Sequence, residues 1–225
     1  MILVNILLAV IPSLALLWYF YRKDARKKEP PKVIWFVFLM GVVSTGPIIA
    51  IELLTSRYFA PTDLTAYLLF EAFVVAGLVE ETIKYGVVMR FAYNRPEFDE
   101  VADGLVYTIA AGLGFALAEN ILYSTGPTHV LLIRGLTAVP FHAFNSGILG
   151  YYIGYSKYYE NRRIRGLLAA IALHGLYDLF LFIAEAAPGI SSIAYLSILI
   201  ILIELRWVRY LYREAVQLDI DDGRS

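Results

Sequence analysis

The sequence predicts an all-α fold, a polytopic bundle of about seven transmembrane helices. Of the 225 residues, 59% are hydrophobic and only 17% are charged, and the mean hydropathy is +0.64. Soluble domains are about 45–50% apolar and about 25% charged. Apolar runs of roughly 20 residues recur along the chain, and an α-helix of that length crosses the ~30 Å hydrocarbon core of a bilayer. We therefore expect one transmembrane domain over residues 1–225.

Seven apolar runs give the predicted spans in chain order. They cover residues 2–21, 33–54, 67–91, 104–123, 130–156, 166–184 and 190–208. The first is not preceded by basic residues and lacks a small-residue cleavage site, so a retained helix is expected rather than a signal peptide. Small residues in the third, fourth and fifth spans favour close helix packing. These are Gly77, Ala110, Gly114, Ala118, Gly147 and Gly150. In the fifth span, Pro140 removes a backbone hydrogen bond and predicts a bend. The sixth is only just long enough to cross.

The distribution of charge predicts the orientation. Of the 19 Lys and Arg residues, 16 lie in the connections after the first, third and fifth spans and in the segment that starts at Arg206. Only Arg57 lies on the opposite side, while Lys84 and Arg134 fall within spans. Basic connections face the cytoplasm. We therefore expect a protein of the cell membrane with its amino terminus outside and its carboxyl terminus in the cytoplasm.

Polar side chains recur at depth in four of the predicted spans. They are Glu80, Glu81 and Lys84 in the third, Glu119 and Asn120 in the fourth, His142 and Asn145 in the fifth, and His174 and Asp178 in the sixth. Several are three or four residues apart, which places them on one helix face. Ionisable groups inside a membrane usually indicate function. The alternative is that Glu80 with Lys84, and His174 with Asp178, only stabilise helix packing.

Other charged residues in or near the spans are expected to be less informative. Glu52, Glu71, Glu185 and Glu204 lie near predicted span ends and are expected at the interface. Arg134 is expected to extend its guanidinium outward toward the headgroups.

The polar set favours chemistry on water. The chain has no cysteine, so a thiol nucleophile or thiolate metal ligand is excluded. Two adjacent carboxylates in a low dielectric do not both ionise readily, and Lys84 would keep one of them charged, which leaves a general base beside a potential acid. Histidine and asparagine donors could stabilise an oxyanion. Alternatively, Glu80, His142 and His174 could hold Zn²⁺ with a position open for water.

Taken in order, these motifs resemble the PrsW family of intramembrane proteases, which is related to the CAAX prenyl endopeptidases and bacteriocin-processing membrane proteases. The resemblance rests on Tyr21, Asp24, Glu29-Pro30, Glu80-Glu81-x-x-Lys84, Asp103-Gly104, Phe115-x-x-x-Glu119-Asn120, His142 and His174-x-x-x-Asp178. The CAAX enzymes usually carry an arginine after the glutamate pair and an asparagine four residues after the last histidine. Lys84 and Asp178 differ from that pattern, which favours the PrsW branch and argues against a prenylated substrate.

The resemblance implies an intramembrane endopeptidase that makes the first cut in a membrane-anchored anti-sigma factor and so starts a stress response. On this reading Glu80 is the base and Glu81 orients it. His142 and His174 are oxyanion donors or ligands of a possible Zn²⁺. Supporting roles fall to Lys84, Glu119, Asn120, Asn145 and Asp178. The expected partners are a membrane-anchored protein substrate and lipids, with no nucleic acid.

Two other functions fit the same residues. A proton-coupled membrane transporter also uses chains of Glu, His and Asp side chains. A non-catalytic membrane receptor or immunity protein of the same fold would bind a partner without cleaving it.

Overall fold

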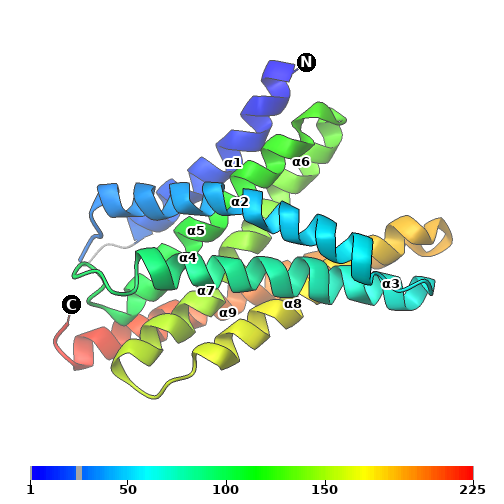
Figure 1. The fold of residues 1–225 in the computed structure, drawn as a ribbon. Coiled ribbons are helices and arrows are strands. Elements are labelled where there is room, and N and C mark those ends of the chain that lie inside the picture. The colour runs from blue at the N-terminus through cyan, green and yellow to red at the C-terminus, as the bar shows by residue number, and fades with distance from the viewer. Residues whose placement is uncertain (1, 24–26, 225) are drawn as a thin grey trace.

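The computed structural model describes residues 2–23 and 27–224, and over these residues the chain is an assembly of helices without a strand. Asp24, one of the residues in the family resemblance, lies outside them. The elements are α1 (Ile2–Lys23), α2 (Pro31–Phe59), α3 (Leu64–Phe70), η1 (Glu71–Glu80), α4 (Glu81–Phe91), α5 (Val101–Leu122), η2 (Tyr123–Thr125), α6 (Thr128–Leu136), α7 (Ala138–Tyr158), α8 (Arg163–Ala186), η3 (Pro188–Ala194) and α9 (Tyr195–Asp221) (Figure 1).

Five helical segments of the described chain are long and apolar enough to cross a membrane. They are Ile2–Lys23, Pro31–Phe59, Val101–Thr125, Arg163–Ala186 and Pro188–Asp221. Their outer faces are apolar, with Trp18 62% exposed on α1 and Leu39 51% exposed on α2. Such faces are stable only against lipid or another protein. These features confirm the expected all-α membrane bundle.

The two remaining predicted spans have a less regular form. The third is a continuous helical run through α3, η1 and α4, and its middle part, Glu71–Glu80, is π-helical. Such wider turns often occur at functional sites. The fifth is two helices, α6 and α7, separated at Thr137 with φ −122° and ψ −68°. The expected single helix bent at Pro140 is therefore wrong. Pro140 lies in the first turn of α7, where a missing amide hydrogen is tolerated.

Helix α5 lies at the centre of the bundle, because 94% of the residues in its most apolar stretch are buried inside the protein. It packs most extensively against α7 and α2. Glycines make these contacts possible: a Cβ atom on Gly104 would lie 2.3 Å from the carbonyl oxygen of Gly150, and one on Gly114 would lie 2.0 Å from that of Phe38. Small residues therefore set the close helix spacing, as the sequence predicts.

The four basic segments of the chain gather at one end of the bundle, at the left of Figure 1. Lys27, before α2, pairs with Asp99, before α5. Tyr159, after α7, donates a hydrogen bond of 2.5 Å to Asp222, after α9. This clustering is what the predicted orientation requires, although the side of the membrane stays a prediction.

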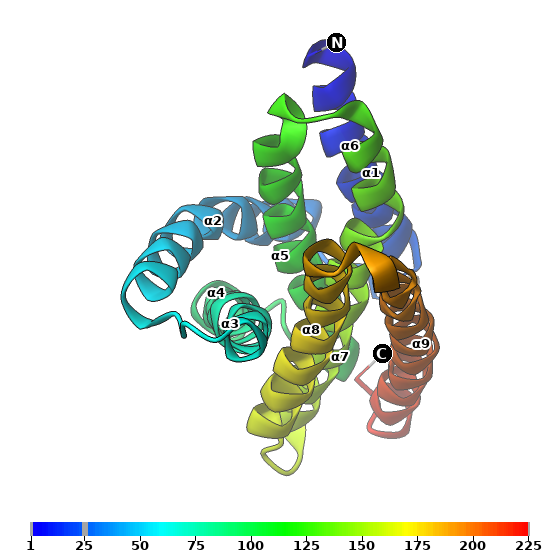
Figure 2. The same cartoon turned by 90° about the vertical axis from the view of Figure 1, so that its right-hand side faces the viewer.

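Figure 2 shows α8 between α3 and α9, with α2 arching around α3 and α4.

Candidate active site

The polar residues predicted at depth meet where η1, α4, α5, α7 and α8 come together. Glu80 ends η1, Glu81 begins α4, and Lys84 lies one turn further along. His142 comes from α7 and His174 from α8. All five side chains are buried, with Lys84 and Glu81 at 0% exposure. Groups separated by up to 94 residues in the sequence therefore form one cluster.

Lys84 is the hub of this cluster. Its Nζ donates to Glu80 Oε2 at 2.9 Å and to Glu81 Oε1 at 2.9 Å. It also lies 3.2 Å from Nδ1 of His142. On its remaining side, Nζ sits 4.2 Å from the centre of the Phe115 ring, a cation–π contact. A charge buried in a membrane protein needs such compensation.

The contacts of His142 fix its tautomer. An ammonium group only donates hydrogen bonds, so Nδ1, which faces Lys84, must be the acceptor. The ring proton is then on Nε2, which lies 3.1 Å from Glu119 Oε2. Glu119 in turn pairs with Arg134 at 2.7 Å. The neutral imidazole is thus oriented from both sides, by a lysine and by a carboxylate.

Arg134 does not extend outward as the sequence predicts. Besides its ion pair with Glu119, its Nε donates to Asn120 Oδ1 at 2.7 Å. The expectation was wrong because α6 is a separate short helix that brings Arg134 back against α5, where two polar side chains receive it. The amide nitrogen of Asn120 is buried and has no hydrogen-bond partner in the described part of the chain.

His174 is held by three carboxylates. Its Nδ1 lies 2.8 Å from Glu81 Oε1, and its Nε2 lies 3.2 Å from Asp178 Oδ2 and 3.8 Å from Glu80 Oε2. The stacked rings of Phe141 and Tyr177, 4.0 Å apart, pack α7 against α8 beside it. These contacts explain how two helices without a shared sequence motif align their histidines, whose ring centres are 5.5 Å apart.

Asn145, predicted as a supporting residue, joins two of the helices that carry the cluster. Its amide nitrogen donates to the carbonyl oxygen of Ala170 at 3.2 Å, which ties α7 to α8. Its side-chain oxygen is buried without a hydrogen-bond partner in the described residues. We find no contact between Asn145 and the glutamates or histidines among the described interactions.

Glu204 is not at the interface, as the sequence suggested, but fully buried on α9. Neither carboxylate oxygen has a hydrogen-bond partner in the described residues, and the charged groups that act on it are Glu81 and His174. The expectation failed because α9 continues to Asp221, so Glu204 lies well inside it. The helical spacing of Ser197, Ile201, Glu204 and Val208, all buried, is the signal that identifies this inward face. Of the other three glutamates expected at the interface, Glu185 is exposed, and Glu52 and Glu71 are half-buried.

The cluster has a donor set that fits a metal ion. One ligand atom each from Glu80, Glu81, His142 and His174 lies within 4.8 Å of the other three. Two imidazoles with one or two carboxylates are the usual ligands of catalytic Zn²⁺. Oε2 of Glu81 is buried without a hydrogen-bond partner in the described residues, so it is free to bind a cation. Lys84 contacts three of the four residues, and a bound ion would displace its ammonium group.

Comparison with known proteins gives a consistent assignment. The sequence profile described as PrsW family intramembrane metalloprotease matches residues 29–205. Protease PrsW of Geobacillus kaustophilus is 39% identical over 181 residues, 78% of this chain and 79% of that protein. The Oceanobacillus iheyensis protein of that name is 36% identical over 91% of both chains, and the Bacillus subtilis one 34% identical over 76% of this chain and 80% of its own. No solved structure matches the chain.

Proposed function

Because the chain belongs to the PrsW family of intramembrane metalloproteases and is a multi-pass membrane protease, we propose that its active centre is the buried cluster around Lys84. The observation that carries this proposal is the convergence of Glu80, Glu81, His142 and His174 within 4.8 Å. Hydrolysis of a peptide bond needs a base for water and donors for the oxyanion. Both kinds of group meet here, inside the membrane bundle.

We assign the role of general base to Glu80, because it is the less confined of the two glutamates. The Glu80 side chain keeps 9% exposure, against 1% for that of Glu81, so water reaches it first. In the proposed step Glu80 takes a proton from water as the oxygen adds to the peptide carbon. It then returns that proton to the amine nitrogen as the carbon–nitrogen bond breaks.

Glu81 positions the other groups. Its Oε1 accepts from Lys84 and contacts Nδ1 of His174, each within 3 Å, so a single oxygen links the lysine to the histidine. His174, held in this way, presents Nε2 toward Glu80 and Asp178. We propose that this nitrogen donates to the oxyanion. On the α7 side, His142 directs its single N–H at Glu119, which pairs with Arg134. Its proposed role is therefore to hold Lys84 through Nδ1 or to offer Nδ1 to a metal ion.

A metal ion is compatible with the same residues. Zn²⁺ held by Glu80, His142 and His174 would polarise the attacking water and the substrate carbonyl. Glu81, Asp178 and Glu119 would then orient the ligand side chains, which is the usual task of groups around a metal site.

We further propose a single-span membrane protein as the substrate, such as an anti-sigma factor whose first cleavage starts a stress response. The support for this substrate is the motif resemblance, in particular Lys84 and Asp178 in place of the residues of the prenyl-protein endopeptidases. A site buried among membrane helices also suits a substrate that is itself embedded in the bilayer.

The test is direct cleavage. The purified protein, reconstituted in lipid, is incubated with a panel of single-span anti-sigma factors, and mass spectrometry identifies the products. We expect one new terminus in or near the substrate's membrane segment, absent with the Glu80→Gln variant. Cleavage at equal rates by wild type and Glu80→Gln would contradict the assignment. Substrate flux in liposomes without any cleavage would instead indicate a transporter.

A further inference from the structure

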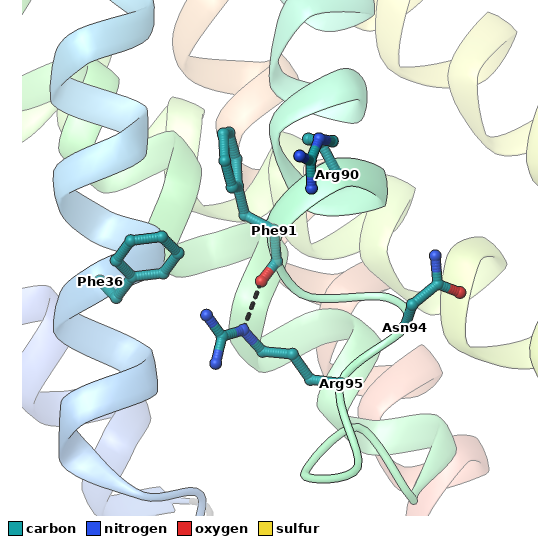
Figure 3. Close-up of a pocket in the computed structure, with 5 residues that line it drawn as sticks. All are labelled: Phe36, Arg90, Phe91, Asn94 and Arg95. Carbon is teal, nitrogen blue, oxygen red and sulfur yellow. Dashed lines mark hydrogen bonds between the residues drawn. The ribbon is translucent and has the colours of Figure 1, made fainter.

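A basic pocket lies at the end of the bundle where the basic segments gather. Phe36 of α2 forms one wall, and Arg90, Phe91, Asn94 and Arg95 from the end of α4 and the turn after it form the other (Figure 3). Its volume is about 350 Å³. Arg90 follows Glu81 by nine residues, or about 14 Å along the helix, so the pocket is separate from the active site.

The two arginines of this pocket carry charge that no carboxylate in the described part of the chain neutralises. Neither Arg90 nor Arg95 forms an ion pair with a carboxylate in residues 2–23 and 27–224. The Nε of Arg95 donates to the carbonyl oxygen of Phe91 at 2.6 Å, and its guanidinium lies 5.0 Å from the centre of the Phe36 ring. These contacts hold the Arg95 side chain in place and leave its terminal nitrogens available to an anion.

The surroundings of the pocket indicate an amphipathic anion. Next to Phe36, α2 presents Trp35 at 48% exposure and Leu39 at 51% exposure. These residues belong to an apolar helix long enough to cross the membrane, and tryptophan is typical of the headgroup region. A ligand held here would therefore place its charge on the arginines and hydrocarbon chains along α2.

We propose that this pocket binds the phosphate of an anionic phospholipid. Guanidinium groups bind phosphate oxygens with paired, charge-assisted hydrogen bonds, and basic pockets beside membrane helices hold lipid headgroups. Asn94 is the remaining residue that lines the pocket. The bound headgroup links α2 to the end of α4, the helix that carries Glu81 and Lys84.

The experiment compares lipids on the purified full-length protein in detergent. Phosphatidylglycerol, phosphatidylcholine or inorganic phosphate is titrated while the unfolding temperature is followed, and native mass spectrometry counts retained lipids. We expect phosphatidylglycerol to raise the unfolding temperature and to remain bound. The double variant Arg90→Gln with Arg95→Gln should bind at least about tenfold more weakly, a loss of about 1.4 kcal/mol.

A matched control removes two charges elsewhere at the same end. Arg22 and Arg165 are exposed and lie outside the pocket, so Arg22→Gln with Arg165→Gln should behave like wild type. Equal losses of lipid affinity in the two double variants would show that only net charge matters, and would contradict the proposal of a lipid site in this pocket. If inorganic phosphate raised the unfolding temperature as much as phosphatidylglycerol does, the proposal that the ligand is a lipid would be wrong. If the pocket double variant does not fold, Arg90→Gln alone, whose side chain makes no described hydrogen bond, serves the same comparison.

Discussion

Glu80 and Glu81 are neighbours in the sequence, yet they are held differently, and this difference leads to a prediction. Glu80→Gln keeps an oxygen that accepts from Lys84 but removes the base. We expect cleavage to fall by at least about 10²-fold, the usual scale for loss of a general base. The unfolding temperature should change little, because Lys84 still pairs with Glu81 at 2.9 Å. The two measurements are the initial cleavage rate and the unfolding temperature of the purified protein in detergent.

The opposite result would identify a packing role. Breaking a buried ion pair by removing one charge typically costs about 3–5 kcal/mol. If the Glu80–Lys84 pair only stabilises the bundle, Glu80→Gln would fold poorly, and adding Lys84→Met would restore both stability and activity. Wild-type cleavage by the double variant would exclude Glu80 as the base.

A second prediction at the level of single residues concerns the metal. Elemental analysis of the purified protein should find about one equivalent of zinc per chain, lost in His142→Ala, if Glu80, His142 and His174 bind it. Because Lys84 contacts Glu80 and His142, Lys84→Met should bind zinc more tightly than wild type. Full peptidase activity after exhaustive chelation, in protein verified to be free of metal, would rule out a catalytic role for the ion.

Some of these contacts could be predicted from the sequence and others could not. Helical spacing is enough to pair Glu80 with Lys84 and His174 with Asp178, which lie 2.9 Å and 3.2 Å apart. The contact of Lys84 with His142 joins residues 58 apart and depends on how α4 and α7 pack. The positions of Arg134 and Glu204 depend on where α6 and α9 begin and end, which hydropathy locates poorly.

At the scale of the helices, glycine spacing leads to a third prediction. Gly114→Ala would place a methyl group 2.0 Å from the carbonyl oxygen of Phe38, and α2 and α5 would have to separate. Overpacking of this kind typically destabilises by about 1–3 kcal/mol. We expect a clear fall in the unfolding temperature. Gly46→Ala is the matched control, because a methyl group there meets nothing within 4 Å, and alanine favours a helix over glycine. A similar fall in both variants would show that close packing is not the cause.

The outline of the helices follows from composition, and their interruptions do not. Apolar runs locate α1, α2, α5 and α8 with useful accuracy because length and hydropathy alone define such helices. The break at Thr137 lies inside a predicted span whose overall hydropathy does not fall there, although Gly135 and Thr137 are poor helix formers. The π-helical turn over Glu71–Glu80 is likewise invisible to hydropathy, because its extra residue per turn leaves the apolar character unchanged.

For the whole molecule, the charge distribution predicts the orientation in the membrane. Single cysteines can report it, because the chain has no native cysteine. Thr125 and Asn161 are both exposed, and they lie in connections on opposite sides of the predicted spans. Thr125→Cys should react with an impermeant maleimide on intact cells, and Asn161→Cys only after lysis. Labelling of Asn161→Cys on intact cells would reverse the orientation.

The position of Lys84 also limits what this residue can do during a reaction. An ammonium group has three N–H bonds, and Nζ has three polar partners, Glu80, Glu81 and His142. The Phe115 ring lies against the same group. All three N–H bonds of Lys84 are therefore in use before any substrate binds. Lys84 can give a hydrogen bond to a reacting carbonyl only by releasing one of these partners. Its role is therefore to hold the donors and acceptors around it in place. An arginine guanidinium, which is planar and larger, could not make the same three contacts from one atom.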